Sequence, residues 1–158
     1  MIVCRSRSFL WEKRSRHFVN KISLLVVEDH EKYRNALLDL LSREDEFQIV
    51  GVARTAEEGF EILGECSVDL VLVDICLPRM DGISFVKRIH NQYPDLLCVM
   101  ISGYVSPVYI KKSLQAGARG YLLKDNYADI VEGIKSVIRG EIYVSKELGE
   151  VDSSFLQS

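Results

Sequence analysis

The chain has 158 residues, of which 47% are hydrophobic and 27% are charged, proportions that are ordinary for one globular domain. No stretch approaches the roughly 20 consecutive apolar residues of a membrane-spanning helix, so the sequence predicts none. The net charge of −3 is unevenly divided, because residues 1–21 hold six bases and one acid while the remainder holds 14 bases and 22 acids. An acidic body of this kind is unsuited to binding nucleic acid through the phosphate backbone.

Residues 1–21 are predicted to be a basic, disordered N-terminal extension, because they show neither a helical nor a strand period. Their apolar groups are shorter than the core of a signal peptide. An organellar leader and a weak nucleic-acid or membrane contact through Trp11 and the bases stay open as alternatives. The cysteines form no Cys-x-x-Cys pair, and we expect reduced thiols in a cytoplasmic protein: Cys4, Cys66, Cys76 and Cys98.

From residue 22 onward, short apolar runs typical of strands alternate five times with amphipathic patterns typical of helices. The predicted strands are 22–27, 47–53, 68–73, 97–101 and 119–123, and the predicted helices are 31–43, 55–63, 83–92, 105–116 and 128–139. The second strand alternates polar and apolar residues, so we expect it near a sheet edge. Thr55 and Glu58 form a capping-box pattern for the second helix, which we expect to stop at Gly64.

Strands that alternate with helices need crossover connections, which favour a parallel sheet with helices on both faces. The first run, residues 24–27, is apolar throughout, as expected for a strand buried on both sides. We therefore predict an α/β fold with one domain over residues 22–140. Residues 141–158 are predicted to be a C-terminal linker or tail, too short for a second domain.

Four of the predicted strands lead into polar side chains. The acid pair Glu28-Asp29 follows the first strand, and Asp74, Ser102 and Lys124 follow the third, fourth and fifth. In an open α/β sheet the carboxyl ends of the strands share one edge, and ligands bind there. The sequence therefore predicts that carboxylates, a hydroxyl and an amine meet in one site.

Clustered carboxylates repel one another, and a hard divalent cation such as Mg²⁺ relieves that repulsion. We expect Asp29, Asp74 and the backbone carbonyl of Cys76 to bind Mg²⁺ directly. Glu28 is expected to act through a bound water. Mg²⁺, Lys124 and a hydroxyl are suited to phosphoryl transfer, which depends on positioning and on neutralising charge. Because no Gly-rich nucleotide loop occurs, we expect a side chain to be the phosphoryl acceptor, with Asp74 as the nucleophile.

Taken singly, these residues carry little information. An Asp after a strand is usually a helix cap or a loop residue, a Lys is usually surface charge, and Ser102-Gly103 is a common turn pair. The prediction depends on all of them falling at the strand ends of one repeated α/β pattern.

Several segments closely resemble the receiver domain of two-component response regulators. They are Val27-Glu28-Asp29-His30, residues 73–82 (VDICLPRMDG), Ile101-Ser102-Gly103 and residues 117–124 (GARGYLLK). The resemblance extends over residues 22–140. It implies a flavodoxin-like, doubly wound fold with five parallel strands in the order 2-1-3-4-5. It also implies that Asp74 accepts a phosphoryl group from a sensor histidine kinase or a phosphotransfer protein.

The same resemblance gives roles to two switch residues. Ser102 would contact the phosphoryl oxygens, and Tyr121, three residues before Lys124, would swing inward behind it. From its residue type alone, Tyr121 would be an ordinary strand aromatic. The face over residues 105–139 would then change shape and select partners, with homodimerisation on phosphorylation among the expected responses.

Residues 117–125 and 140–145 are similar to the branch of receivers that precede a helix-turn-helix DNA-binding domain. We therefore expect transcriptional output through a DNA-binding domain outside this sequence, with a natural stand-alone receiver as the alternative. The chain is not expected to be an enzyme, beyond catalysing its own phosphorylation and dephosphorylation.

Two other classes of protein fit less well. A haloacid-dehalogenase-like phosphatase would need a second Asp two residues after its nucleophile, where this chain has Cys76. A flavodoxin would need a phosphate-cradling loop after the first strand, where Glu28-Asp29 would repel phosphate. Two departures from the receiver pattern leave details open: Cys76 flanks the route of the hydrolytic water, and Asp125 stands where many receivers have a cis proline.

Overall fold

A computed structural model of the chain describes residues 20–149. Within them, strands and helices alternate along the chain and a short 3₁₀ helix, η2, follows. The elements are β1 Ile22–Val27, α1 Glu31–Ser42, β2 Phe47–Ala53, α2 Ala56–Glu65, β3 Leu70–Asp74, α3 Gly82–Gln92, β4 Leu97–Ser102, α4 Pro107–Ala116, β5 Gly120–Leu123, α5 Tyr127–Ile138, β6 Tyr143–Val144 and η2 Lys146–Leu148. The predictions for residues 1–19 and 150–158, a disordered extension and most of the tail, lie outside the described residues.

All neighbouring strands pair in parallel, in the order β2-β1-β3-β4-β5-β6. The predicted α/β fold and the order 2-1-3-4-5 are confirmed, and β2 lies at an edge as its alternating pattern indicated. The register sets Asp74 beside Ile101 and Ser102 beside Leu123. The polar residues at the ends of these strands therefore emerge at one edge of the sheet.

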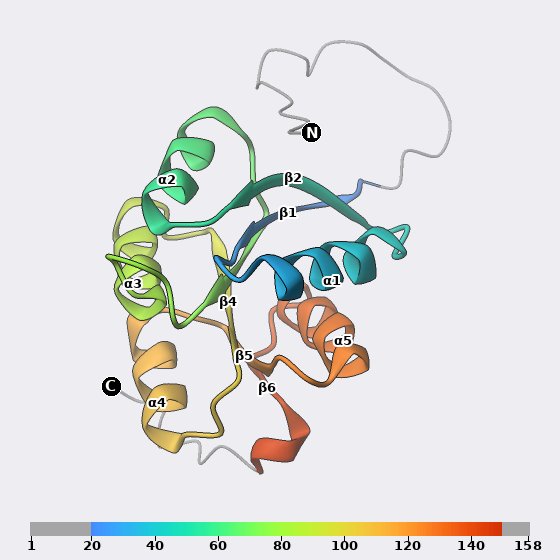
Figure 1. The fold of residues 1–158 in the computed structure, drawn as a ribbon, viewed down its shortest axis with the longest axis vertical. Coiled ribbons are helices and arrows are strands. Elements are labelled where there is room, and N and C mark those ends of the chain that lie inside the picture. The colour runs from blue at the N-terminus through green and yellow to red at the C-terminus, as the bar shows by residue number, and fades with distance from the viewer. Residues whose placement is uncertain (1–19, 150–158) are drawn as a thin grey trace.

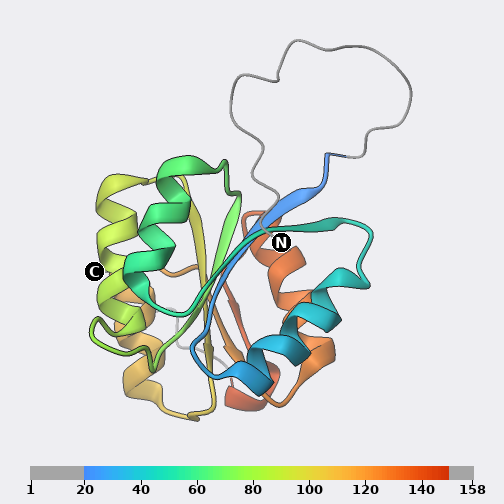
Figure 2. The same cartoon turned by 45° about the horizontal axis from the view of Figure 1, so that its top comes forward.

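Helices cover both faces of the sheet (Figure 1 and Figure 2). Helices α1 and α5 lie on one face, and α2, α3 and α4 lie on the other. Successive side chains of a strand point to opposite faces, so Leu25 and Val27 pack with α2 and α3 whereas Leu24 and Val26 pack with α1 and α5. The central strands are apolar throughout because they are buried on both sides.

Each α-helix begins after a residue whose side chain accepts a hydrogen bond from a first-turn backbone N–H. These cap residues are His30, Thr55, Asp81, Ser106 and Asn126. Thr55 accepts from the N–H of Glu58, as the capping-box pattern predicted, while the Glu58 carboxylate accepts from the N–H of Arg54. Among residues 20–149, no helix is both long and apolar enough to cross a membrane.

The structure differs from the predicted elements by one or two residues at several ends, and in the number of strands. Helix α2 continues through Gly64 to Glu65, because Gly64 does not adopt the left-handed conformation with which a glycine ends a helix. The sheet also gains a sixth strand, β6, which pairs with β5. A two-residue strand is too short to show a period, so β6 could not be predicted from the sequence pattern.

The described cysteines are in different states. Cys76 and Cys98 are free thiols, as predicted, but Cys66 is disulfide-bonded, so the prediction of a reduced thiol is wrong for Cys66. Burial raises the pKa of Cys98 to about 12, which keeps this β4 thiol protonated and unreactive.

Candidate functional site

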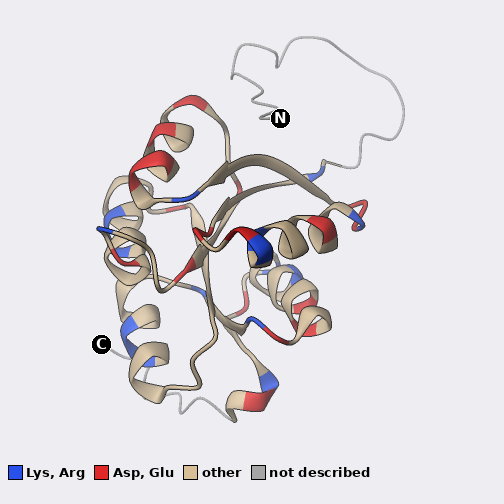
Figure 3. Ribbon diagram, in the orientation of Figure 1, with Lys and Arg blue, Asp and Glu red and all other residues tan. Residues whose placement is uncertain are grey.

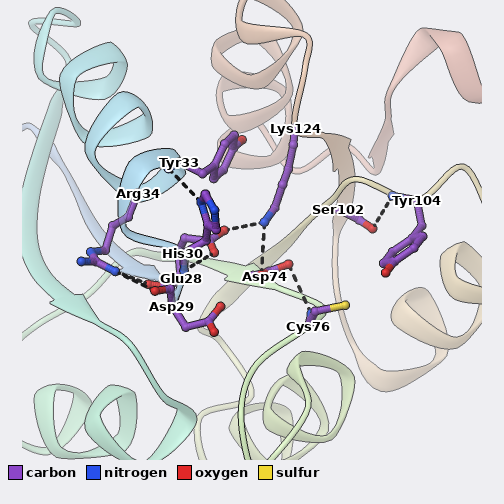
Figure 4. Close-up of polar contacts among 10 residues, drawn as sticks. All are labelled: Glu28, Asp29, His30, Tyr33, Arg34, Asp74, Cys76, Ser102, Tyr104 and Lys124. Atoms are coloured by element: carbon purple, nitrogen blue, oxygen red, sulfur yellow. Dashed lines mark hydrogen bonds and ion pairs between the residues drawn. The ribbon is translucent and has the colours of Figure 1, made fainter.

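Three carboxylates meet at the edge of the sheet where β1 and β3 end (Figure 4), and the ribbon there is red for acidic residues in Figure 3. Glu28 and Asp29 directly follow β1, and Asp74 is the last residue of β3. Each offers one carboxylate oxygen, and these oxygens all lie within 4.8 Å of one another. Glu28 and Asp74 are buried, whereas Asp29 is exposed. The structure thus brings together the acids that the strand ends predicted, with one of them open to solvent.

Lys124, which follows β5, extends into this acid cluster (Figure 4). Its Nζ lies 2.7 Å from Oε2 of Glu28 and 3.2 Å from Oδ2 of Asp74. Burial lowers the pKa of Lys124, but its hydrogen bond to Glu28 and the charge of Asp74 outweigh burial, so the pKa lies above its ordinary value. Lys124 is therefore a fixed positive charge between two of the acids.

Asp74 is held in an environment that disfavours its negative charge. Burial and the charge of Glu28 raise the pKa of Asp74 to about 6, although Lys124 and the backbone N–H of Cys76 act in the opposite direction. The Cys76 N–H donates to Oδ1 of Asp74 at 3.2 Å. Lys124 contacts two of the three acids of the cluster, which therefore keeps an excess of negative charge.

This excess of negative charge fits a hard divalent cation. Mg²⁺ prefers oxygen ligands, keeps several waters and is usually held by one or two carboxylates. Asp29 and Asp74 are the residues that would hold it. Glu28 is less available for direct binding, because its Oε1 accepts from the N–H of His30 at 2.9 Å and its Oε2 contacts Lys124. The expected roles of Glu28 through a water and of the Cys76 carbonyl as a ligand stay predictions.

Arg34 supports the acid pair, a role that no sequence pattern predicted. This α1 residue is buried, and its guanidinium donates to the carbonyl oxygens of Glu28 and Asp29, each at 3.1 Å. These bonds fix the backbone that carries both acids (Figure 4). An arginine in a helix usually faces solvent, so only its place one turn after an acid pair could have suggested this role.

Ser102 lies at the end of β4, beside the acid cluster. Its hydroxyl oxygen accepts from the N–H of Tyr104 at 2.9 Å, and Figure 4 shows it turned toward Tyr104. Tyr121 is fully buried, and its hydroxyl donates to the carbonyl oxygen of the same Tyr104 at 2.9 Å. Ser102 and Tyr121 therefore both hold the β4–α4 loop. The Tyr121 ring is already buried in this structure, and its expected movement on phosphorylation stays a prediction.

The loop between Asp74 and α3 packs tightly against the end of β3. The N–H of Gly82 donates to the carbonyl oxygen of Ile75 at 2.9 Å, and a Cβ at Gly82 would lie only 2.1 Å from the carbonyl oxygen of Asp74. Glycine is therefore needed at Gly82 for the close approach of two backbone segments.

Every described peptide bond is trans, including the bond between Lys124 and Asp125, whose isomer the sequence left open.

The chain is similar to known proteins both in sequence and in fold. The family model of the response regulator receiver domain matches residues 24–135. The transcriptional regulatory protein DegU of Brevibacillus brevis is 31% identical over 126 residues, which are 79% of this chain and 53% of DegU. This chain therefore spans about half the length of that relative.

Solved structures show the same fold. A CheY-like receiver domain protein from Methanospirillum hungatei is 30% identical, with a TM-score of 0.69 over 76% of this chain and 95% of that one. A LuxR-family response regulator from Aurantimonas, 24% identical, has a TM-score of 0.78 over 81% of this chain and 92% of that one, a likeness of fold. Because the family model matches residues 24–135, from β1 into α5, the chain belongs to the response regulator receiver domain family of two-component systems.

Proposed function

We propose that this chain is a phosphoacceptor switch, phosphorylated on Asp74. The observation that supports the proposal is the placement of Asp74, which shares its site with two other carboxylates and lies 3.2 Å from the Lys124 ammonium. A carboxylate at a strand end beside a fixed cation is positioned to attack phosphorus. The donor would be the phosphohistidine of a sensor histidine kinase or a phosphotransfer protein.

In the proposed transfer, a carboxylate oxygen of Asp74 forms a bond to phosphorus while the phosphorus–nitrogen bond of the donor histidine breaks. The leaving imidazole nitrogen takes up a proton from water, and Asp74 becomes an acyl phosphate. Lys124 would hold one phosphoryl oxygen by its ammonium. Mg²⁺, held by Asp29 and Asp74, would neutralise charge on the phosphoryl group.

Phosphorylation would act on the β4–α4 loop through Ser102. To donate to a phosphoryl oxygen, the Ser102 hydroxyl would have to turn from the N–H of Tyr104 toward Asp74. Tyr121 already lies in the buried position, so the phosphoryl group would stabilise an existing arrangement of Tyr121 and change mainly the loop. This change would alter the face over residues 105–139.

The downstream role goes beyond this domain. DegU is named a transcriptional regulatory protein, and this chain matches about half of it. We propose that output is transcriptional, in the cytoplasm, through a DNA-binding domain outside this sequence, with homodimerisation on phosphorylation. A stand-alone receiver that acts by protein–protein contact is the alternative. In either case the chain would turn over no substrate beyond its own phosphoryl group.

Acetyl phosphate offers a direct test, because it is a small phosphoryl donor that needs no kinase. Incubated with it and Mg²⁺, the wild-type chain should gain the mass of one phosphoryl group, and Asp74→Asn should gain none. Asp39→Asn is the matched control, since Asp39 lies exposed on α1 and pairs only with Arg43 in the described structure. A phosphoryl group on Asp74→Asn would show that the acceptor is wrong, and turnover of p-nitrophenyl phosphate would favour a phosphatase.

A further inference from the structure

We propose that Tyr33 is a positioning residue for Lys124, acting through the face of its aromatic ring. The proposal rests on the proposed phosphorylation of Asp74 and adds a residue to that reaction. Tyr33 lies in the first turn of α1, and the Lys124 Nζ lies 4.6 Å from the centroid of its ring (Figure 4). This is the geometry of a cation–π interaction.

The contact with the Tyr33 ring adds an aromatic group to the two carboxylates around the Lys124 ammonium. Glu28 and Asp74 approach Nζ at 2.7 Å and 3.2 Å, and the ring of Tyr33 is its third neighbour. A lysine side chain has a flexible four-carbon stem and loses rotamer freedom when it is held. An aromatic face beside the two carboxylates restricts the ammonium to the side of the site where a phosphoryl oxygen of Asp74 would lie.

The ring of Tyr33, and not its hydroxyl, carries this role. The Tyr33 hydroxyl oxygen is buried and has no hydrogen-bond partner among the described residues. Burial and the charge of Glu28 raise the pKa of Tyr33, so the phenol is neutral and its ring keeps an uncharged face. Phenylalanine at this position should therefore keep the contact with Lys124, whereas leucine, which is aliphatic and smaller, should lose it.

The test compares Tyr33→Phe with Tyr33→Leu in the full chain, using acetyl phosphate and Mg²⁺. Phosphorylation of Tyr33→Phe should proceed within about twofold of the wild-type rate, and that of Tyr33→Leu should be roughly 3- to 10-fold slower. Phe47→Leu is the matched control, because Lys135 lies over the Phe47 ring at 5.9 Å, outside the acid cluster. It should leave the rate unchanged.

A second measurement does not depend on phosphorylation. In NMR spectra, the ε-methylene protons of Lys124, assigned with Lys124→Arg, should be shifted upfield by the Tyr33 ring. The shift should persist in Tyr33→Phe and disappear in Tyr33→Leu. Equal rates in the two variants, or an unchanged shift in Tyr33→Leu, would overturn the role of Tyr33. If the wild-type chain accepts no phosphoryl group, the proposed function fails, and the NMR shift still decides whether Tyr33 positions Lys124.

Discussion

At the scale of single residues, the candidate site holds more negative charge, on its three carboxylates, than Lys124 can neutralise. Asp74 is buried next to Glu28, and Lys124 is the one cation that contacts both within residues 20–149. The pKa of Asp74 is raised to about 6 despite Lys124, so ionisation of Asp74 lowers the stability of the cation-free fold. A group with this property is suited to take up a cation or a phosphoryl group.

Asp74→Asn tests this balance. In EDTA at pH 7, the variant should be more stable than the wild-type chain, by on the order of 1–3 kcal/mol, because it removes an unfavourable charge. The unfolded carboxyl loses its proton near pH 3.8 and the folded one near pH 6, so the wild-type chain loses stability as pH rises between these values. The advantage of the variant should therefore be full above pH 6, shrink as pH falls, and vanish below about 3.8.

The measurement is urea unfolding followed by circular dichroism at each pH. Glu28 retains its contact with Lys124 in the variant, so the lysine keeps a partner at 2.7 Å. A variant that is less stable than the wild-type chain at pH 7, or a difference that does not change with pH, would show that Lys124 compensates the Asp74 charge fully.

The site residues differ in how far the sequence could predict them. Glu28, Asp74 and Lys124 stand at strand ends, and the topology of a parallel sheet brings such positions together. Arg34 and Tyr33 lie inside a helix, where residue type does not tell which side chain turns back toward the preceding loop. Their contacts depend on how α1 packs, and that is a property of the folded chain.

At the scale of elements, the start of α3 can lie against the end of β3 only because Gly82 has no side chain. A Cβ at Gly82 would meet three backbone atoms, at 2.1, 2.9 and 3.0 Å, and backbone atoms cannot move aside as a flexible side chain can. The loop that leads from Asp74 to α3 therefore depends on Gly82.

Gly82→Ala should destabilise the fold by about 1–3 kcal/mol or more and slow phosphorylation, because the clash displaces Asp74. Gly64→Ala is the control with the same atomic change. Gly64 lies within α2, and a Cβ there meets nothing within 4 Å, so alanine should add about 0.4–1 kcal/mol of stability. Thermal unfolding of both variants checks the pair. Equal effects at the two glycines would mean that the backbone contact at Gly82 relaxes at little cost.

Strand β6 shows what periodicity cannot predict. Its position is set by Ser145, whose N–H donates to the carbonyl oxygen of Tyr121 and whose hydroxyl accepts from the N–H of Leu123. Ser145 is fully buried, so these bonds satisfy polar groups that water does not reach. A serine after two strand-like residues is common in turns, and only the folded β5 reveals its partners.

At the scale of the whole molecule, the sheet separates two apolar cores and gathers the polar chemistry at one edge. The strands were predictable because burial on both faces makes them continuous apolar runs, and the helices because each buries one stripe. The position of the site at the carboxyl ends of the strands was predictable from the parallel topology. Element ends were less predictable, since single hydrogen bonds such as that from the N–H of Cys66 to the carbonyl of Ile62 decide them.

Because the acid cluster forms only when β1 and β3 lie side by side, a cation bound there should stabilise the whole fold. A cation that binds only the folded chain adds about 2.7 kcal/mol at a concentration 100 times its Kd. We therefore expect Mg²⁺ to raise the Tm of the wild-type chain relative to NaCl of matched ionic strength. Asp29→Asn should lose most of this increase, because it removes the exposed carboxylate of the cluster.

Asp39→Asn should keep the full increase, since Asp39 is an exposed acid of α1 that the cluster does not include. The comparison separates binding at the strand edge from a general effect of divalent ions on an acidic surface. Screening of surface charge would act on both variants alike. If Asp29→Asn gains as much from Mg²⁺ as the wild-type chain, the cation binds elsewhere, and the three carboxylates are balanced by Lys124 and solvent alone.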